Sequence, residues 1–134
     1  MNNEDKFRKN MKCLDKWLSN RENNKWIADY LNNCQISRVG IYGYGILGKH
    51  LVRELQKRDF SIKWVMDRVS MGDETCHDIQ RPDHLSELED VEMAIITSLA
   101  AVEDVEALLL QKVTGKVISI EELIDTVFGW GNQN

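Results

Sequence analysis

The sequence has few of the features that mark boundaries between domains. Its 134 residues include a single proline, Pro82, and no internal repeat, low-complexity tract or linker-like stretch. A chain of this length is sufficient for one hydrophobic core. We therefore expect one compact unit, with an N-terminal helical extension at residues 1–35 and an α/β part at residues 36–134.

Basic charge is scarce as well. Lys and Arg number 17 against 22 Asp and Glu, so the formal net charge is −5. Because a basic excess is needed to bind phosphate backbones or anionic membrane surfaces, we expect no nucleic-acid partner and no membrane partner. No apolar run approaches the roughly 18 residues of a membrane span. Residues 1–10 lack the apolar segment of a secretory signal. These absences predict a cytoplasmic protein.

The chain also lacks the side-chain groupings of metal sites and of common catalytic sites. It has three widely spaced cysteines and no C-x-x-C pair, which is typical of free thiols in a reducing compartment: Cys13, Cys34 and Cys76. Potential ligands gather only between residues 76 and 84, without a metal-ligand spacing: Cys76, His77, Asp78 and His84. We therefore expect no metal cofactor, and we identify no catalytic residues.

What is present is an alternation of short strands and helices. Two amphipathic helices are expected first, at residues 5–19 and 26–31, with Asn23 or Asn24 capping the second. The first has an apolar stripe at Phe7, Met11, Leu14 and Leu18. Strands are expected at 38–42, 61–66, 75–79, 91–97 and 116–119, and helices at 47–58, from Pro82, at 101–112 and from Ser119 to about Phe128.

This alternation predicts an α/β fold of the Rossmann-like type, with about five mostly parallel strands and right-handed crossovers. We expect the strand order 3-2-1-4-5, with the weak third strand at an edge. The two N-terminal helices must bury their apolar stripes against a sheet face or against a second copy of the chain. A homodimer through these helices is therefore one prediction.

The most informative motif is a glycine loop between the first predicted strand and the helix after it. Gly43, Gly45 and Gly48 follow the G-x-G-x-x-G pattern in the strand-to-helix position where that pattern binds dinucleotides. Gly43 allows the tight turn, Gly45 lets the backbone approach a pyrophosphate, and Gly48 lets the helix pack closely. The N–H groups at the helix start bind phosphate without a lysine. In the alternative interpretation the glycines serve the turn alone.

An acidic residue follows the second predicted strand. Asp67 comes 19 residues after Gly48, where the pattern places a carboxylate that accepts hydrogen bonds from ribose hydroxyls. Such a carboxylate repels a 2′-phosphate, so NAD or a nucleoside diphosphate is favoured over NADP. Arg68 either stacks on a base or pairs with Asp67. The alternative is that Asp67 only caps a loop.

Two hydroxyl residues end the fourth predicted strand, beside the expected ligand position. Thr97 and Ser98 either contact the distal phosphate or sugar of a ligand, or Ser98 or a neighbour caps the following helix. The residues expected to bind the cofactor are Gly43, Tyr44, Gly45, Ile46, Leu47, Gly48, Asp67, Arg68 and Thr97.

Together, the glycine loop, Asp67 and the apolar run at 94–97 resemble small NAD(P)-binding Rossmann-like domains, especially those associated with bacterial surface-polysaccharide genes. They are also similar to the nucleotide-sugar-binding N-terminal domains of sugar acyltransferases, which share an x-x-P-x-x-L segment, matched here at residues 80–85. The resemblance covers residues 36–124. The chain has neither the left-handed β-helix of those acyltransferases nor the Tyr-x-x-x-Lys of epimerases and dehydrogenases, so it implies ligand binding alone.

The sequence thus predicts a non-catalytic module that binds NAD or a nucleotide-sugar in a sugar-related or polysaccharide-related pathway. One alternative is an interaction module that dimerises on a Rossmann scaffold without a ligand. Another is a minimal enzyme that modifies a nucleotide-sugar.

Overall fold

The computed structural model of the chain describes residues 2–67, 79, 82 and 84–131. Four strands form one parallel sheet in the order β2-β1-β3-β4. They are β1 (Arg38–Tyr42), β2 (Ser61–Met66), β3 (Met93–Ile96) and β4 (Lys116–Ser119). Three of them coincide with the predicted ranges, and β3 lies within its range. The sheet described has four strands instead of five, because the predicted strand at 75–79 falls outside the described residues except for Ile79.

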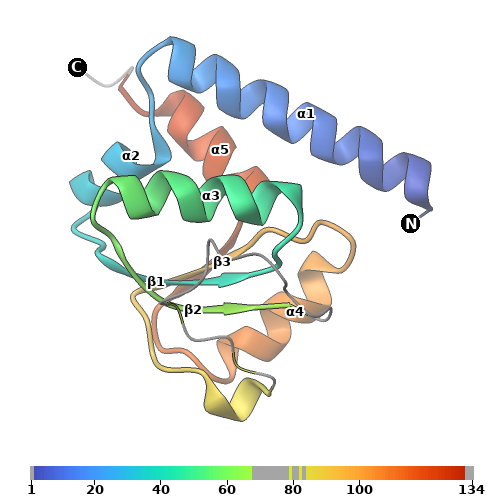
Figure 1. Ribbon diagram of the computed structural model, residues 1–134, viewed down its shortest axis with the longest axis vertical. Coiled ribbons are helices and arrows are strands. Elements are labelled where there is room, and N and C mark those ends of the chain that lie inside the picture. The colour runs from blue at the N-terminus through green and yellow to red at the C-terminus, as the bar shows by residue number, and fades with distance from the viewer. Residues whose placement is uncertain (1, 68–78, 80–81, 83, 132–134) are drawn as a thin grey trace.

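Helices cover both faces of this sheet (Figure 1). One face packs against α3 (Ile46–Lys57) and α5 (Ile120–Gly129). Helices α1 (Asn3–Glu22) and α2 (Ile27–Asn33) pack on the same side and contribute to the same core. The other face packs against α4 (Val102–Leu110), with the short 3-10 helix η2 (Leu85–Glu87) beside it. Each face has its own cluster of buried apolar side chains. This is the doubly wound α/β arrangement that the alternating elements predict.

Helix α3 illustrates how closely periodicity determines a local element. Its apolar side chains recur every three or four residues, and all four that were expected to face inward are buried: Leu47, Leu51, Val52 and Leu55. Helix α5 starts as expected too, because the Ser119 hydroxyl accepts a hydrogen bond from the Glu122 N–H at 3.1 Å.

Helix α1 buries a different face from the one predicted. Phe7, Met11 and Leu18 are 67%, 53% and 52% exposed. The buried residues are instead Cys13, Trp17 and Asn20. At 100° per residue this second face is about 130° around the helix from the apolar stripe. The choice follows from the neighbours of α1, which packs against α5 and α3.

Two smaller predictions near the helix ends are also wrong. The N-cap of α2 is Trp26, where Asn23 or Asn24 was expected. Asn23 instead ends α1, and Asn24 adopts a left-handed backbone with φ 61°. In α4, Leu108 was expected to face inward but is 46% exposed, whereas Val105 and Leu109 are buried.

Candidate functional site

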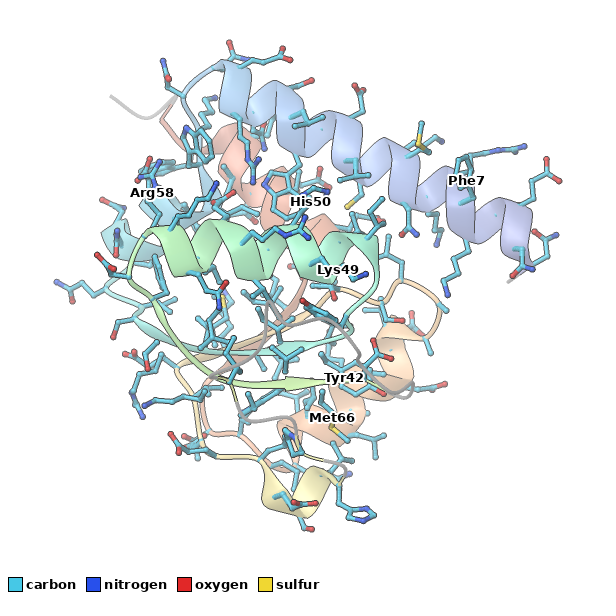
Figure 2. The ribbon with its side chains drawn as sticks, viewed as in Figure 1. Phe7, Tyr42, Lys49, His50, Arg58 and Met66 are labelled. Atoms are coloured by element: carbon cyan, nitrogen blue, oxygen red, sulfur yellow. The ribbon has the colours of Figure 1, made fainter. Side chains whose placement is uncertain are left out.

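The register of the sheet brings three predicted site residues to one edge. Tyr42, the last residue of β1, pairs with Met66 at the end of β2 and with Ile96 at the end of β3. Each strand is parallel to its neighbour, so the residues that follow, Gly43, Asp67 and Thr97, emerge side by side. Figure 2 shows Tyr42 and Met66 together at this edge, below the start of α3. In open α/β sheets such a carboxyl edge is where ligands bind.

Gly43 makes the turn that leaves β1. Its φ is +105°, a left-handed conformation that L side chains rarely adopt. A Cβ here would lie 2.6 Å from Thr97 Oγ1 and 2.8 Å from the Ser98 nitrogen. The Gly43 N–H donates to the Met66 carbonyl at 2.7 Å, which continues the β1–β2 pairing into the turn. The tight-turn role predicted for this glycine matches its geometry.

Gly48 lies where the first turn of α3 crosses the loop. A Cβ at this position would be 2.2 Å from the Gly43 carbonyl oxygen and 2.9 Å from Thr97 Oγ1. Only a glycine therefore allows α3 to pack this closely on the ends of β1 and β3. The close-packing role predicted for Gly48 is the one its position requires.

Gly45 differs from both, because no described residue lies within 4 Å of where its Cβ would be. It is the N-cap of α3, with an ordinary φ of −81°, and no side chain caps the helix there. Ile46 is 50% exposed, whereas Leu47 is buried in the core. The first turn of α3, which the structure describes in full, contains no acidic residue. An acid-free helix start beside an open Cβ position suits an anion, because the first N–H groups and the helix dipole favour negative charge.

Asp67 is joined to the loop directly. The backbone N–H of Tyr44 donates a hydrogen bond to Asp67 Oδ2, and the Asp67 side chain is only partly buried. The residue after β2 thereby holds the second residue of the glycine loop. A carboxylate has about four acceptor positions, so one group can both hold the loop and accept from a ligand. Arg68, the next predicted site residue, lies outside the described residues.

Thr97 supports the loop from the other side. Its buried hydroxyl lies 2.8 Å from the Gly43 carbonyl and 3.1 Å from the Tyr42 carbonyl, both of which accept its proton. Contact between Thr97 and a ligand stays a prediction. The capping role considered for Ser98 is wrong, because α4 starts after Ala101 and has no side-chain cap.

Tyr44 and Lys49 line the loop above the sheet edge. Tyr44 is buried, with 6% of the residue exposed. Lys49 Nζ lies 5.8 Å from the centroid of that ring, a cation–π distance. Figure 2 shows Lys49 at the start of α3, on the side of the sheet edge. A cation therefore lies within one helical turn of the open space at Gly45.

A hollow of about 420 Å³ lies next along the same edge, at the ends of β3 and β4. Its walls come from residues 99–101, the first turn of α4, the end of β4 and helix α1, which extends past the N-terminal end of α3 (Figure 1). Three carboxylates and one ammonium line it: Glu103, Asp104, Glu121 and Lys9. The sequence interpretation missed this hollow. Ser119, one of its lining residues, signals it by ending a parallel strand at the same edge.

Other kinds of site are not found in the part of the chain that the structure describes. No group of three His, Cys, Asp or Glu side chains within it is arranged to hold a metal ion. Cys76, His77 and Asp78 lie outside that part, and His84 is exposed before η2, where its N–H donates to Glu87 at 3.1 Å. Among the described helices, none combines the length and apolar character needed to cross a bilayer.

Comparison of the chain with protein-family models, with curated proteins and with solved structures finds no match. The resemblance to nucleotide-binding domains of sugar metabolism therefore stays a prediction from the motif, to be judged on the geometry of the loop.

Proposed function

We propose that the protein is a nucleotide-binding module whose glycine loop holds the diphosphate of NAD or of a nucleotide-sugar. The observation that carries the proposal is the arrangement of the loop with Asp67. Gly43 and Gly48 shape a tight turn into α3, Gly45 leaves an open space at the helix start, and Asp67 lies beside it. Phosphate at the helix start and ribose at Asp67 is the division of roles expected for this loop.

The charges at the two ends of the loop favour particular ligands. The acid-free first turn of α3 favours a phosphate. Asp67, by contrast, accepts hydrogen bonds from hydroxyl groups and repels a second phosphate placed on the ribose. We therefore expect NAD+ to bind more tightly than NADP+.

The hollow at the ends of β3 and β4 supports a ligand that extends past its phosphates. Its three carboxylates and one lysine make it net negative, which disfavours another phosphate. A sugar with several hydroxyl groups, or a positively charged nicotinamide ring, suits this lining. The distal half of NAD+ and the sugar of a nucleotide-sugar both meet that description.

The test is a thermal-melting and calorimetric screen with NAD+, NADP+, ADP-ribose and a UDP-sugar. A ligand that binds only the folded state, at a hundred times its Kd, adds about 2.7 kcal/mol to the free energy of unfolding. We expect this shift with NAD+ or the UDP-sugar. A flat response across the whole panel would contradict the proposal.

Substitutions at Gly45 locate the binding. Gly45→Val and Gly45→Asp keep an allowed backbone and meet no neighbour, yet each obstructs the phosphate position, and aspartate also repels it. Gly129→Val is the matched control, since nothing lies within 4 Å of its Cβ position either. We expect both Gly45 variants to stay folded and lose the ligand shift, and the control to keep it.

A second candidate function is pairing of two chains through α1. Phe7, Met11, Leu14 and Leu18 are spaced by 4, 3 and 4 residues, as at the a and d positions of a coiled coil, and three of them are more than half exposed. Arg8 and Asp15 flank this stripe at equivalent heptad positions with opposite charges. Two antiparallel copies of α1 would bring each arginine to the partner's aspartate across a two-fold axis.

Oligomeric state tests this second candidate. Phe7→Ser with Met11→Ser is expected to convert a dimer into a monomer in sedimentation equilibrium. Phe128→Ser removes another phenylalanine of 67% exposure and is expected to leave the dimer intact. Deleting α1 is the poorer experiment, because Trp17 is buried in the core. A monomeric wild-type chain at high micromolar concentration would exclude this function.

A further inference from the structure

A second concave site lies at the other end of α3, away from the glycine loop. A hollow of about 460 Å³ is formed by the end of α1, the residue before α2, and residues 50–58 in and just after α3. Its lining includes four permanently charged cations and one histidine: Arg21, Arg53, Lys57, Arg58 and His50. Figure 2 shows His50 and Arg58 along the side of α3 that faces α1 and α2. We call this site the basic pocket; Trp26 and Glu54 complete its lining.

Two of its cations are already neutralised. The buried Glu54 carboxylate accepts from Arg21 at 2.6 Å, from the Trp17 indole at 3.2 Å and from the Ala28 N–H at 2.9 Å. Arg58 pairs with Asp29 at 2.8 Å. Among the described residues that line the pocket, Glu54 is the one carboxylate, and it is fully engaged.

Arg53 and Lys57 carry the remaining charge. Within the described residues no carboxylate forms an ion pair with either side chain, although the whole chain has a net charge of −5. The two cations are four residues apart on one face of α3, a like-charge spacing that destabilises a helix. The helix dipole stabilises the positive charge of Lys57 in the last turn, but not that of Arg53 a full turn earlier. Helix stability alone thus does not explain their convergence on the hollow.

The neutralised pair of arginines gives the pocket a fixed wall. The guanidinium carbons of Arg21 and Arg58 lie 4.7 and 5.1 Å from the centroid of the Trp26 ring. Side chains held in this way lose less conformational entropy when a ligand binds. Their remaining N–H groups are donors in the fork geometry that suits phosphate oxygens.

We propose that the basic pocket binds a small anion that carries phosphate groups, independently of the nucleotide held by the glycine loop. Among the described residues, the basic pocket shares no lining residue with the proposed nucleotide site, and at 1.5 Å per residue its cations Arg53 and Lys57 lie about 10 and 16 Å along α3 from Ile46. The volume of the basic pocket is in the range of sites for small metabolites. Arg53 and Lys57 supply the charge, and the Arg21–Trp26–Arg58 wall orients the phosphate.

His50 offers a local reporter of binding. Partial burial lowers its pKa, and the charges of Arg53 and Arg21 lower it further. A phosphate placed between these arginines offsets their charge, so the pKa of His50 rises when the pocket fills. His50 is also only four residues from Ile46, so a phosphate at the start of α3 raises this pKa too, and the reporter is therefore read in the Gly45→Val variant as well.

The experiment titrates inorganic pyrophosphate into the full chain at constant ionic strength, followed by calorimetry and by NMR of the His50 ring. Arg53→Gln with Lys57→Gln tests the pocket, and Lys112→Gln with Lys116→Gln removes the same charge from an exposed region outside it. We expect the pocket variant to lose about a hundredfold in affinity and the control to change by less than about threefold. Arg53→Lys with Lys57→Arg keeps the charges and is expected to restore binding.

Pyrophosphate is also a ligand for the proposed nucleotide site, so each measurement is repeated in the Gly45→Val variant. The His50 shift should persist there and vanish in the pocket variant. If the shift is absent in the wild-type chain, or if the control pair abolishes it equally, the basic pocket is not a phosphate site. Binding lost only in Gly45→Val would overturn this inference while leaving the proposed function standing.

Discussion

The backbone N–H of Tyr44 donates a hydrogen bond to the carboxylate of Asp67, and this bond ties the glycine loop to the end of the neighbouring strand. The same carboxylate is the expected ribose ligand. Asp67 therefore shapes the loop before any ligand arrives, and its removal has consequences for stability as well as for binding.

Asp67→Ala should lower the free energy of unfolding by about 1–3 kcal/mol, because the Tyr44 N–H loses its acceptor. Asp67→Asn keeps an acceptor oxygen at the same place and should cost less. Urea unfolding of the three proteins measures both effects. If the nucleotide site is as proposed, Asp67→Asn should also reduce the preference for NAD+ over NADP+. Equal stability of the alanine variant and the wild type would show that the bond contributes little.

Gly43→Ala and Gly45→Ala should differ sharply although both lie in one motif. At Gly43 the added methyl group meets Thr97 and Ser98, and the backbone is left-handed, so we expect a loss of about 2 kcal/mol or more. At Gly45 the methyl group meets no described residue within 4 Å, and the cost should stay below about 1 kcal/mol. Thermal melting of the two variants provides the comparison, and similar costs would contradict the loop geometry.

Glu54→Ala should be among the most damaging single changes in α3. It leaves Arg21, the Trp17 indole and the Ala28 N–H without their shared acceptor inside the fold, at a cost of about 3 kcal/mol or more. Glu54→Gln keeps one acceptor oxygen and should lose less. Glu89→Ala is the control, since its contact with Lys63 at 3.7 Å is exposed and is worth less than about 1 kcal/mol. Chemical unfolding measures all three.

Glu92 should make the protein sensitive to acid. Hydrogen bonds from the Ser37 and Arg38 N–H groups hold its pKa below the ordinary 4.5. A lowered folded-state pKa stabilises the protein above that ordinary value, and the contribution disappears as the pH falls through the folded-state pKa.

Glu92→Gln removes the titrating group, so its unfolding free energy should approach that of the wild type as the pH drops below about 4.5. Unfolding curves collected between neutral and acidic pH give the comparison. Glu22→Gln removes an exposed charge at the end of α1, and its unfolding free energy should change with pH in parallel with that of the wild type. A constant gap between Glu92→Gln and the wild type at every pH would refute this origin of acid sensitivity.

The local sequence pattern was sufficient to predict most strands and helices of the α/β part. The strand at 38–42, the helix after it and the strand at 61–66 were predicted within one residue, because β-rich runs and a 3.6-residue apolar period act over short stretches of chain. The roles of Gly43 and Gly48 were also readable, since a strand that turns directly into a helix permits few backbone paths.

Other features depend on neighbours that lie far away in sequence. The burial of Glu54 is one, because its partners come from α1 and α2, and the only local signal is an acidic residue three positions after the inward-facing Leu51. The basic pocket is another, since its wall joins residues more than thirty positions apart.

The sequence by itself determined where the four described strands and their flanking helices form and where the glycine loop lies, because these depend on propensities and spacings within one segment. The tertiary structure decided which face of α1 is buried. Both faces have helical spacing, but Cys13, Trp17 and Asn20 meet α5 and α3, whereas the more apolar face of Phe7, Met11 and Leu18 remains in solvent. Periodicity fixes which residues share a face, and only the packing of distant elements selects the face that loses its contact with water.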